Sequence, residues 1–190
     1  HALGFIESNK GKPFLLSLHF RAPHSAWLPV RPEDWEPFKD LDPEIPNPDF
    51  PHLNVELVKK RTREYLAAVK SVDRNVGRVL DTLDALKLTA NTIVVFTSDH
   101  GYNLGEHGTW FKGNAIRILK QNPAKQWVDI PAQRRPNLWD TSLRVPTAIR
   151  WPGTIKAGTV HDQTFSNLDW FPTLLAMAGI KPARRLELRG

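Results

Sequence analysis

The hydrophobic pattern of the chain predicts short strands that alternate with helices. Residues 13–20 form an apolar run too short for a helix, and residues 91–97 form a β-branched run bounded by turn residues; both patterns are typical of buried strands. Residues 55–86 place apolar side chains at three- and four-residue steps, which predicts one long amphipathic helix with a charged, solvated face. A third strand is predicted at residues 146–151, before a Pro-Gly stop.

A helix and a stiff loop complete this pattern. Ser166 and Asn167 can cap a last helix, which Gly179 ends. Eight prolines between Pro23 and Pro51 predict an extended loop, which we interpret as a covering loop rather than a substrate-contacting one. Four aromatic side chains are predicted to hold it on the protein body: Trp27, Trp35, Phe38 and Phe50. The order of elements favours the α/β class, with a largely parallel sheet sandwiched by helices.

Composition narrows the class of protein. A length of 190 residues is typical of about one domain, and 41% hydrophobic with 24% charged residues excludes disordered and collagen-like chains. No apolar run reaches the roughly 18 residues of a membrane span. The chain has no cysteine, which excludes disulfides, thiolate metal sites and a cysteine nucleophile within it. The net charge of +6 is spread along the chain, so we predict no nucleic-acid partner.

The clearest chemical signal follows the second predicted strand. Asp99 and His100 come directly after it, and Gly101, which lets the backbone turn, comes next. Ligands of open α/β sheets bind at the carboxyl ends of the strands, where a carboxylate beside an imidazole is a metal-ligand arrangement. The same dipeptide also fits an aspartate that caps the next turn beside an exposed histidine. On these two residues alone, both interpretations stay open.

Other basic side chains could bind an anion. His24 follows the first predicted strand, and Lys112 ends a glycine-rich stretch that also holds His107. A lysine after an aromatic pair can aim its charge inward at a sulfate or phosphate oxygen, although a surface position is the default for any single lysine. His19, inside the first predicted strand, is interpreted as a core histidine with a satisfied ring.

Four segments, in the same order, resemble the type I sulfatases of the alkaline phosphatase superfamily. The segment TSDHGYNLGEHGTWFK at 97–112 is similar to the metal-binding segment of that family, and LHFRAPH at 18–24 to the segment with its sulfate-contacting histidine. NLWDTSLRVP at 137–146 resembles the approach to the next core strand, and SNLDWFPTLL at 166–175 a helix near the end of the catalytic domain. The resemblance implies an alkaline phosphatase-like fold.

The resemblance also implies roles for individual residues. Asp99 and His100 would be two ligands of one divalent cation, for which Ca²⁺ is favoured and Mg²⁺ or Mn²⁺ are alternatives. Lys112 and His24 would bind the sulfate and act in catalysis, with His24 as a hydrogen-bond donor or general acid. His107 would also line the substrate site.

The chain departs from the family at the nucleophile. Type I sulfatases carry a formylglycine made from the first residue of a Cys/Ser-x-Pro-x-Arg motif, and this chain has no such motif. We therefore expect residues 1–190 to be the C-terminal part of a catalytic domain, inactive alone, with the remainder of that domain as partner. Residues 113–136 are longer than the usual link, and we interpret them as a surface insertion rather than a substrate-side loop.

The expected function is hydrolysis of a small-molecule or saccharide sulfate ester. One alternative is a phosphonate or phosphate ester hydrolase of the same superfamily, because both oxyanions are tetrahedral. A second alternative is a catalytically dead homologue that binds anions in the same pocket. The resemblance favours a periplasmic, secreted or lysosomal location.

Overall fold

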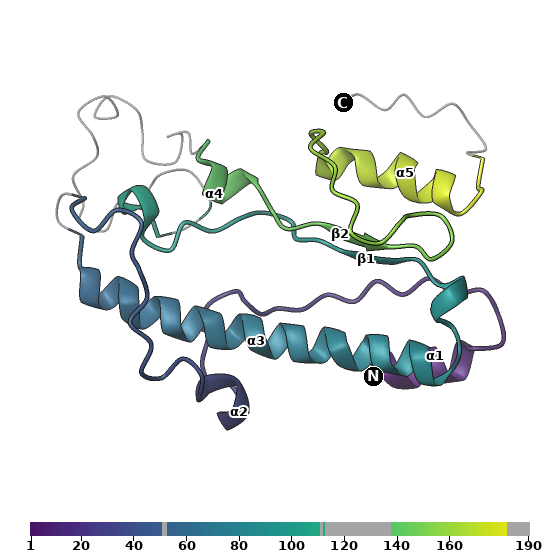
Figure 1. Ribbon diagram of the computed structural model, residues 1–190, viewed down its shortest axis with the longest axis horizontal. Helices are drawn as coiled ribbons and strands as arrows, with labels where there is room; N and C mark the ends of the chain where they lie inside the picture. The colour runs from purple at the N-terminus through teal and green to yellow at the C-terminus, as the bar shows by residue number, and fades with distance from the viewer. Residues whose placement is uncertain (51–52, 111, 113–137, 182–190) are drawn as a thin grey trace. The chain divides into compact units, whose positions relative to one another are not determined.

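The fold is described from a computed structural model, which covers residues 1–50, 53–110, 112 and 138–181. The chain forms two compact units, residues 1–154 and residues 155–190 (Figure 1). The first unit contains α1 (Ala2–Asn9), α2 (Pro32–Trp35), α3 (Val55–Ala85), η1 (Thr89–Asn91), β1 (Val94–Phe96), η2 (Glu106–Gly108), α4 (Asp140–Leu143) and β2 (Ala148–Arg150). The second contains η5 (Asn167–Asp169) and α5 (Trp170–Met177).

The long helix α3 confirms the prediction for residues 55–86 to within one residue. The side chain of Asn54 caps it by accepting a hydrogen bond from Leu57 N–H at 3.0 Å. Both α1 and α2 contact α3. The core of this unit lies along the helix, where five side chains are buried with Ile6 of α1: Val58, Ala67, Ala68, Val72 and Leu83.

The strands β1 and β2 occur where they were predicted, and they pair antiparallel with Val95 opposite Ile149. The pairing continues beyond the strands, because the hydroxyls of Thr97 and Thr147 lie 2.9 Å apart. This pair therefore differs from the expected parallel arrangement. The chain enters β2 beside the same end at which it leaves β1, whereas a parallel partner would need a crossover back to the opposite end.

Residues 13–20 do not form the predicted buried strand. Figure 1 shows them as an extended segment, which pairs with no strand among the residues that the structure covers. Leu15 is 86% exposed, and His19, predicted as a core histidine, is also exposed with its Nε2 at 2.9 Å from Ser17 Oγ. An apolar run becomes a buried strand only where another strand satisfies its backbone groups and a second layer covers it.

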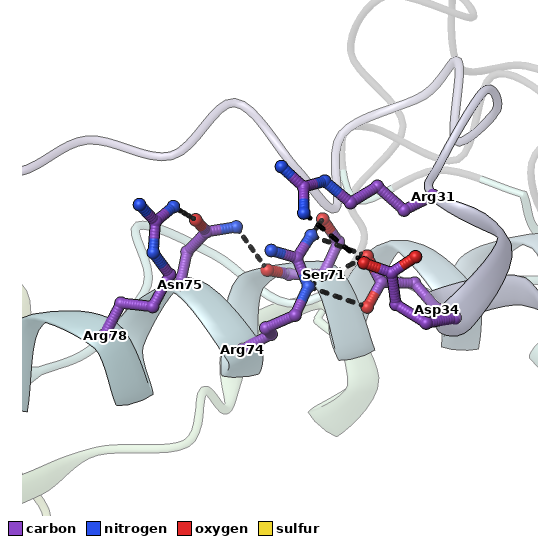
Figure 2. A network of polar contacts seen from close by, with 7 residues as sticks. Arg31, Asp34, Ser71, Arg74, Asn75 and Arg78 are labelled. Carbon is purple, nitrogen blue, oxygen red and sulfur yellow. Dashed lines mark hydrogen bonds and ion pairs between the residues drawn. The ribbon is translucent and has the colours of Figure 1, made fainter. Parts of the chain in front are cut away.

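The proline-rich loop is held on α3 by charged contacts. Asp34 of α2 has no exposed surface, and Arg74 donates to its two carboxylate oxygens, from Nε at 3.0 Å and from Nη2 at 2.8 Å (Figure 2). Lys59 pairs with Asp42 at 2.6 Å, and Arg63 donates to a backbone carbonyl of the same loop at 3.1 Å. The charged face of α3, predicted to be solvated, is therefore partly an anchoring surface.

The second unit confirms the predicted last helix. Ser166 Oγ accepts from Leu168 N–H, and the Asp169 carboxylate accepts from Ser166 N–H at 2.7 Å, which is a capping box. Gly179, with a φ of 67°, follows the end of α5. In the part of the chain that the structure covers, no helix is both long and apolar enough to cross a membrane.

Candidate functional site

The predicted metal-ligand pair lies just beyond the end of β1. His100 Nδ1 lies 2.8 Å from Gly101 O, and because a carbonyl oxygen can only accept, this nitrogen carries a proton. The other ring nitrogen, Nε2, lies 3.3 Å from Asp99 Oδ2. The Asp99 side chain is 82% exposed and that of His100 is 35% exposed. The backbone carbonyl thus orients the imidazole so that Nε2 faces the carboxylate.

The spacing of these two atoms fits a shared cation. Two ligands bound at about 2.4 Å, at a right angle to each other, lie about 3.4 Å apart. The capping interpretation also has a geometric basis, because Asp99 Oδ1 accepts from His100 N–H at 3.0 Å and from Ser98 Oγ at 3.3 Å. One carboxylate oxygen therefore fixes the local turn, and the other is the candidate ligand.

The pair can supply only part of a coordination shell. Within the described ranges, no group of three or more Asp, Glu, His or Cys side chains is arranged to hold a metal ion. Hard cations such as Ca²⁺ take six to eight oxygen ligands. A cation at Asp99 and His100 would therefore need ligands from other residues or from water.

His24 has a similarly constrained ring. Its Nδ1 lies 2.7 Å from Ser25 O, so that nitrogen is the donor. Its backbone N–H donates to Arg21 O at 2.8 Å, which closes a turn, and the residue is exposed. The remaining Nε2 can donate a hydrogen bond only as an imidazolium and can accept a proton only as the neutral ring.

An aromatic contact brings the two segments together. Trp27 follows His24 by three residues, Tyr102 follows His100 by two, and the ring centroids of Trp27 and Tyr102 lie 6.1 Å apart. The structure therefore places the turn with His24 beside the segment after β1, although the two are about 75 residues apart in the sequence.

The other two predicted site residues lie in or near the turn after β1. His107, in η2, stacks on Trp139 with ring centroids 3.8 Å apart, and its Nε2 is 3.7 Å from Glu106 Oε1. Its proposed substrate contact stays a prediction, as does that of Lys112, which is partly buried. The predicted insertion at 113–136 lies outside the described residues.

Glycines allow close packing around this turn. A Cβ on Gly101 would overlap the carbonyl of Thr141, so this glycine serves close approach rather than a left-handed turn. Gly105, with a φ of 97°, would place a Cβ 2.8 Å from a methyl group of Val58. Gly108, with a φ of 67°, would place one against the ring of Phe50. The aromatic anchor expected at Phe50 is thus in contact with the turn.

Sequence reasoning missed a buried polar cluster beside the metal-ligand pair. Asn103 is 4% exposed; its Nδ2 donates to Ser142 Oγ at 2.7 Å, and its Oδ1 accepts from Thr141 Oγ1 at 2.6 Å. Gly101 N–H donates to Ser142 O at 2.9 Å. These bonds join the turn after β1 to α4 and continue the β1–β2 ribbon. No local pattern marks them, because the partners lie about 40 residues apart.

Comparisons with known proteins agree on one family. The sequence profile of the family described as Sulfatase matches residues 1–180. Steryl-sulfatase of Rattus norvegicus is 34% identical over 175 residues, which cover 92% of this chain and 25% of the relative. Choline-sulfatase of Rhizobium meliloti is 30% identical over 190 residues, which cover 89% of this chain and 32% of the relative. The chain thus spans a quarter to a third of the length of these relatives.

Two solved structures have a similar fold, and the chain again covers only part of each. The Bacteroides fragilis protein yidJ superposes with a TM-score of 0.74 and 31% identity, over 94% of this chain and 35% of that protein. The protein BT4656, solved with its substrate D-glucosamine-2-N,6-O-disulfate, superposes with a TM-score of 0.76 at 24% identity, over 98% of this chain and 48% of its own. The fold is therefore α/β and alkaline phosphatase-like, as predicted.

Proposed function

The chain belongs to the sulfatase family, and we propose that it supplies metal- and sulfate-binding residues of a sulfuric ester hydrolase. The observation that carries this proposal is the geometry of Asp99 and His100, whose Oδ2 and Nε2 face each other at 3.3 Å just beyond β1. A bound divalent cation would polarise the sulfate oxygens. The carboxylate oxygen of Asp99 is a ligand that suits Ca²⁺ and Mg²⁺, and the imidazole of His100 leaves Mn²⁺ as an alternative. The family resemblance favours Ca²⁺.

Two basic residues complete the proposed chemistry. Lys112 binds a sulfate oxygen as a fixed positive charge. His24, with Nδ1–H donating to Ser25 O, uses Nε2 as the functional atom. As the nucleophile proposed for the remaining part of the domain bonds to sulfur and the sulfur–oxygen bond of the ester breaks, the imidazolium Nε2 donates its proton to the leaving oxygen. The alcohol departs neutral, and His24 is left as the neutral ring. His107 is proposed to line the substrate site.

We propose further that this chain is the C-terminal part of a catalytic domain. The support is that it spans only 25% and 32% of the two enzymes named above, and that it has neither a cysteine nor a Ser-x-Pro-x-Arg motif. The remaining part would provide the formylglycine nucleophile and the other cation ligands. The proposed substrate is a small-molecule or saccharide sulfate ester, and the family resemblance favours an exported or lysosomal parent, which cell fractionation would test.

The metal assignment is tested with the full-length protein that contains this chain. We expect Asp99→Ala to weaken Ca²⁺ affinity in calorimetric titration by about tenfold or more, and to abolish metal-dependent hydrolysis of an aryl sulfate. The matched control is Asp73→Ala, an exposed aspartate on α3, which should retain the wild-type values. Wild-type Ca²⁺ affinity in the Asp99→Ala protein would remove the metal assignment.

Rates on paired substrates separate the alternatives. Aryl sulfate and aryl phosphonate esters with the same leaving group should be compared in the same preparation. Faster turnover of the sulfate supports the proposal, and faster turnover of the phosphonate favours the phosphonate hydrolase. Sulfate binding without turnover of either ester would identify a non-catalytic anion-binding homologue.

A further inference from the structure

Three aromatic side chains from distant parts of the chain meet in one cluster. Trp27 comes from the proline-rich loop, Tyr65 from α3 and Tyr102 from the segment after β1. The Trp27 ring meets Tyr65 at 6.2 Å and Tyr102 at 6.1 Å between centroids, in both cases edge to face at 87°. The two tyrosine rings stack, with centroids 6.4 Å apart and planes at 16°. These are favourable arrangements for aromatic pairs.

Trp27 is the buried ring of the cluster, and a charged side chain of α3 lies over it. Arg61 lies with its guanidinium carbon 5.8 Å from the centroid of the Trp27 ring, and its Nη1 donates to Glu64 Oε2 at 2.7 Å. Glu64 is 6% exposed and Trp27 is 7% exposed. The ion pair therefore holds a cation over the indole ring, and burial raises the pKa of Tyr65, one of the two phenols of the cluster.

The indole also makes a hydrogen bond that shapes the loop. Trp27 Nε1 donates to Pro23 O at 2.8 Å, which ties the ring to the residue immediately before His24. The Trp27 side chain thus closes the turn that carries His24, and the same side chain packs on Tyr102. A shift of the indole would move this turn relative to the segment that holds Asp99 and His100.

We propose that Trp27 is a positioning residue, which sets the turn of His24 against the metal-ligand segment through this aromatic cluster. The inference rests on the proposed role of His24 in sulfate ester hydrolysis. It identifies Trp27, which packs on Tyr65 of α3, as the residue that links the position of His24 to that helix. Trp27 does not touch the substrate. It acts through two contacts that the structure defines, the hydrogen bond to Pro23 O and the edge-to-face contact with Tyr102.

The test is a double-mutant cycle in the full-length protein. Trp27→Phe keeps an aromatic ring but removes the Nε1 donor and part of the contact area. We expect kcat on an aryl sulfate to fall about tenfold or more, with unchanged Ca²⁺ affinity in calorimetric titration. In a His24→Ala background, the same substitution should cause almost no further loss, because its effect passes through His24. The matched control is Trp35→Phe, in the same loop, which should retain wild-type kcat.

A second measurement separates this proposal from the proposed function. If the wild-type protein shows no sulfatase turnover, the proposed function fails, and the NMR signals of the His24 ring still test the positioning. They should shift in Trp27→Phe and not in Trp35→Phe. If Trp27→Phe does not fold, Tyr65→Leu removes one edge-to-face contact and enters the same cycle. Additive losses with His24→Ala, or unchanged His24 signals, would overturn the proposal.

Discussion

At the scale of single residues, the candidate site depends on backbone carbonyls as much as on side-chain chemistry. His24 and His100 each donate from Nδ1 to a nearby carbonyl, at 2.7 and 2.8 Å, so in both rings Nε2 is the atom left for function. The sequence predicted these residues from their place after apolar runs and from the family resemblance. The orientation of each ring depends on the local turn, which only the structure shows.

Gly101 gives a prediction at this scale. A Cβ there would overlap Thr141 O and lie 3.0 Å from Arg144 O, so Gly101→Ala must displace backbone next to Asp99 and His100. We expect a lower thermal midpoint and weaker Ca²⁺ binding in the full-length protein, measured by calorimetry. Gly77→Ala is the matched control: nothing lies within 4 Å of its Cβ, and it should stabilise α3 by about 0.5–1 kcal/mol. If Gly101→Ala leaves the thermal midpoint and Ca²⁺ binding as little affected as Gly77→Ala does, the close approach of Gly101 to Thr141 is contradicted.

At the scale of elements, α3 is the support to which the proline-rich loop is anchored. The contacts occur at three places along the loop: Trp27 packs on Tyr65, Asp34 pairs with Arg74, and Asp42 pairs with Lys59. The helix itself was predicted, because its apolar repeat is local. Which charged residues anchor the loop was not, because Asp34 and Arg74 are 40 residues apart and look like ordinary surface residues in the sequence.

The Asp34–Arg74 pair predicts how stability depends on pH. Hydrogen bonds from Arg74 lower the pKa of Asp34 below its ordinary value. A lowered pKa in the folded state means that the pair stabilises the fold above the unfolded pKa of about 3.9, and that this contribution is lost as the pH falls through the folded pKa. We expect Asp34→Asn to lower the thermal midpoint by several degrees at pH 7, and the gap to wild type to narrow below about pH 4.

The measurement is thermal unfolding followed by circular dichroism from pH 7 to pH 3. Asp40→Asn is the matched control, since the side chain of Asp40 is 87% exposed and its ion pair with Lys39 is long, at 3.9 Å. That variant should follow the wild-type curve. If the difference in thermal midpoint between wild type and Asp34→Asn does not change with pH, the effect comes from packing rather than from charge.

At the scale of the whole molecule, the chain carries many apolar side chains on its surface. Leu15 and Val160 are more than 80% exposed, and Phe96 of β1 is 39% exposed. The strands β1 and β2 form a two-stranded sheet within the described residues, and the chain covers only 35% of the similar solved protein yidJ. This arrangement agrees with the proposal that a further part of the catalytic domain packs on this chain.

The corresponding prediction concerns activity. The purified 190-residue chain should not hydrolyse aryl sulfates, because the proposed nucleophile is not in its sequence. A longer protein that contains this chain together with the proposed Cys/Ser-x-Pro-x-Arg motif should do so in the presence of Ca²⁺. Turnover by the pure 190-residue chain would contradict the proposal that the nucleophile lies in another part of the catalytic domain. An upstream sequence without that motif would contradict the proposal that the protein is a sulfatase.

Features that depend on neighbours along the chain were predicted from the amino-acid sequence. Three such features each involve residues only a few positions apart: the periodicity of residues 55–86, the cap at Ser166, and the Asp-His pair after a β-branched run. The four segments that resemble the family are also short stretches of sequence. Three features became visible only in the folded protein: the antiparallel direction of the β1–β2 pair, the exposure of most of residues 13–20, and the contact between Trp27 and Tyr102. Each of these features depends on which distant segment of the chain packs against it, and the local preference of a residue for helix or strand does not specify that segment.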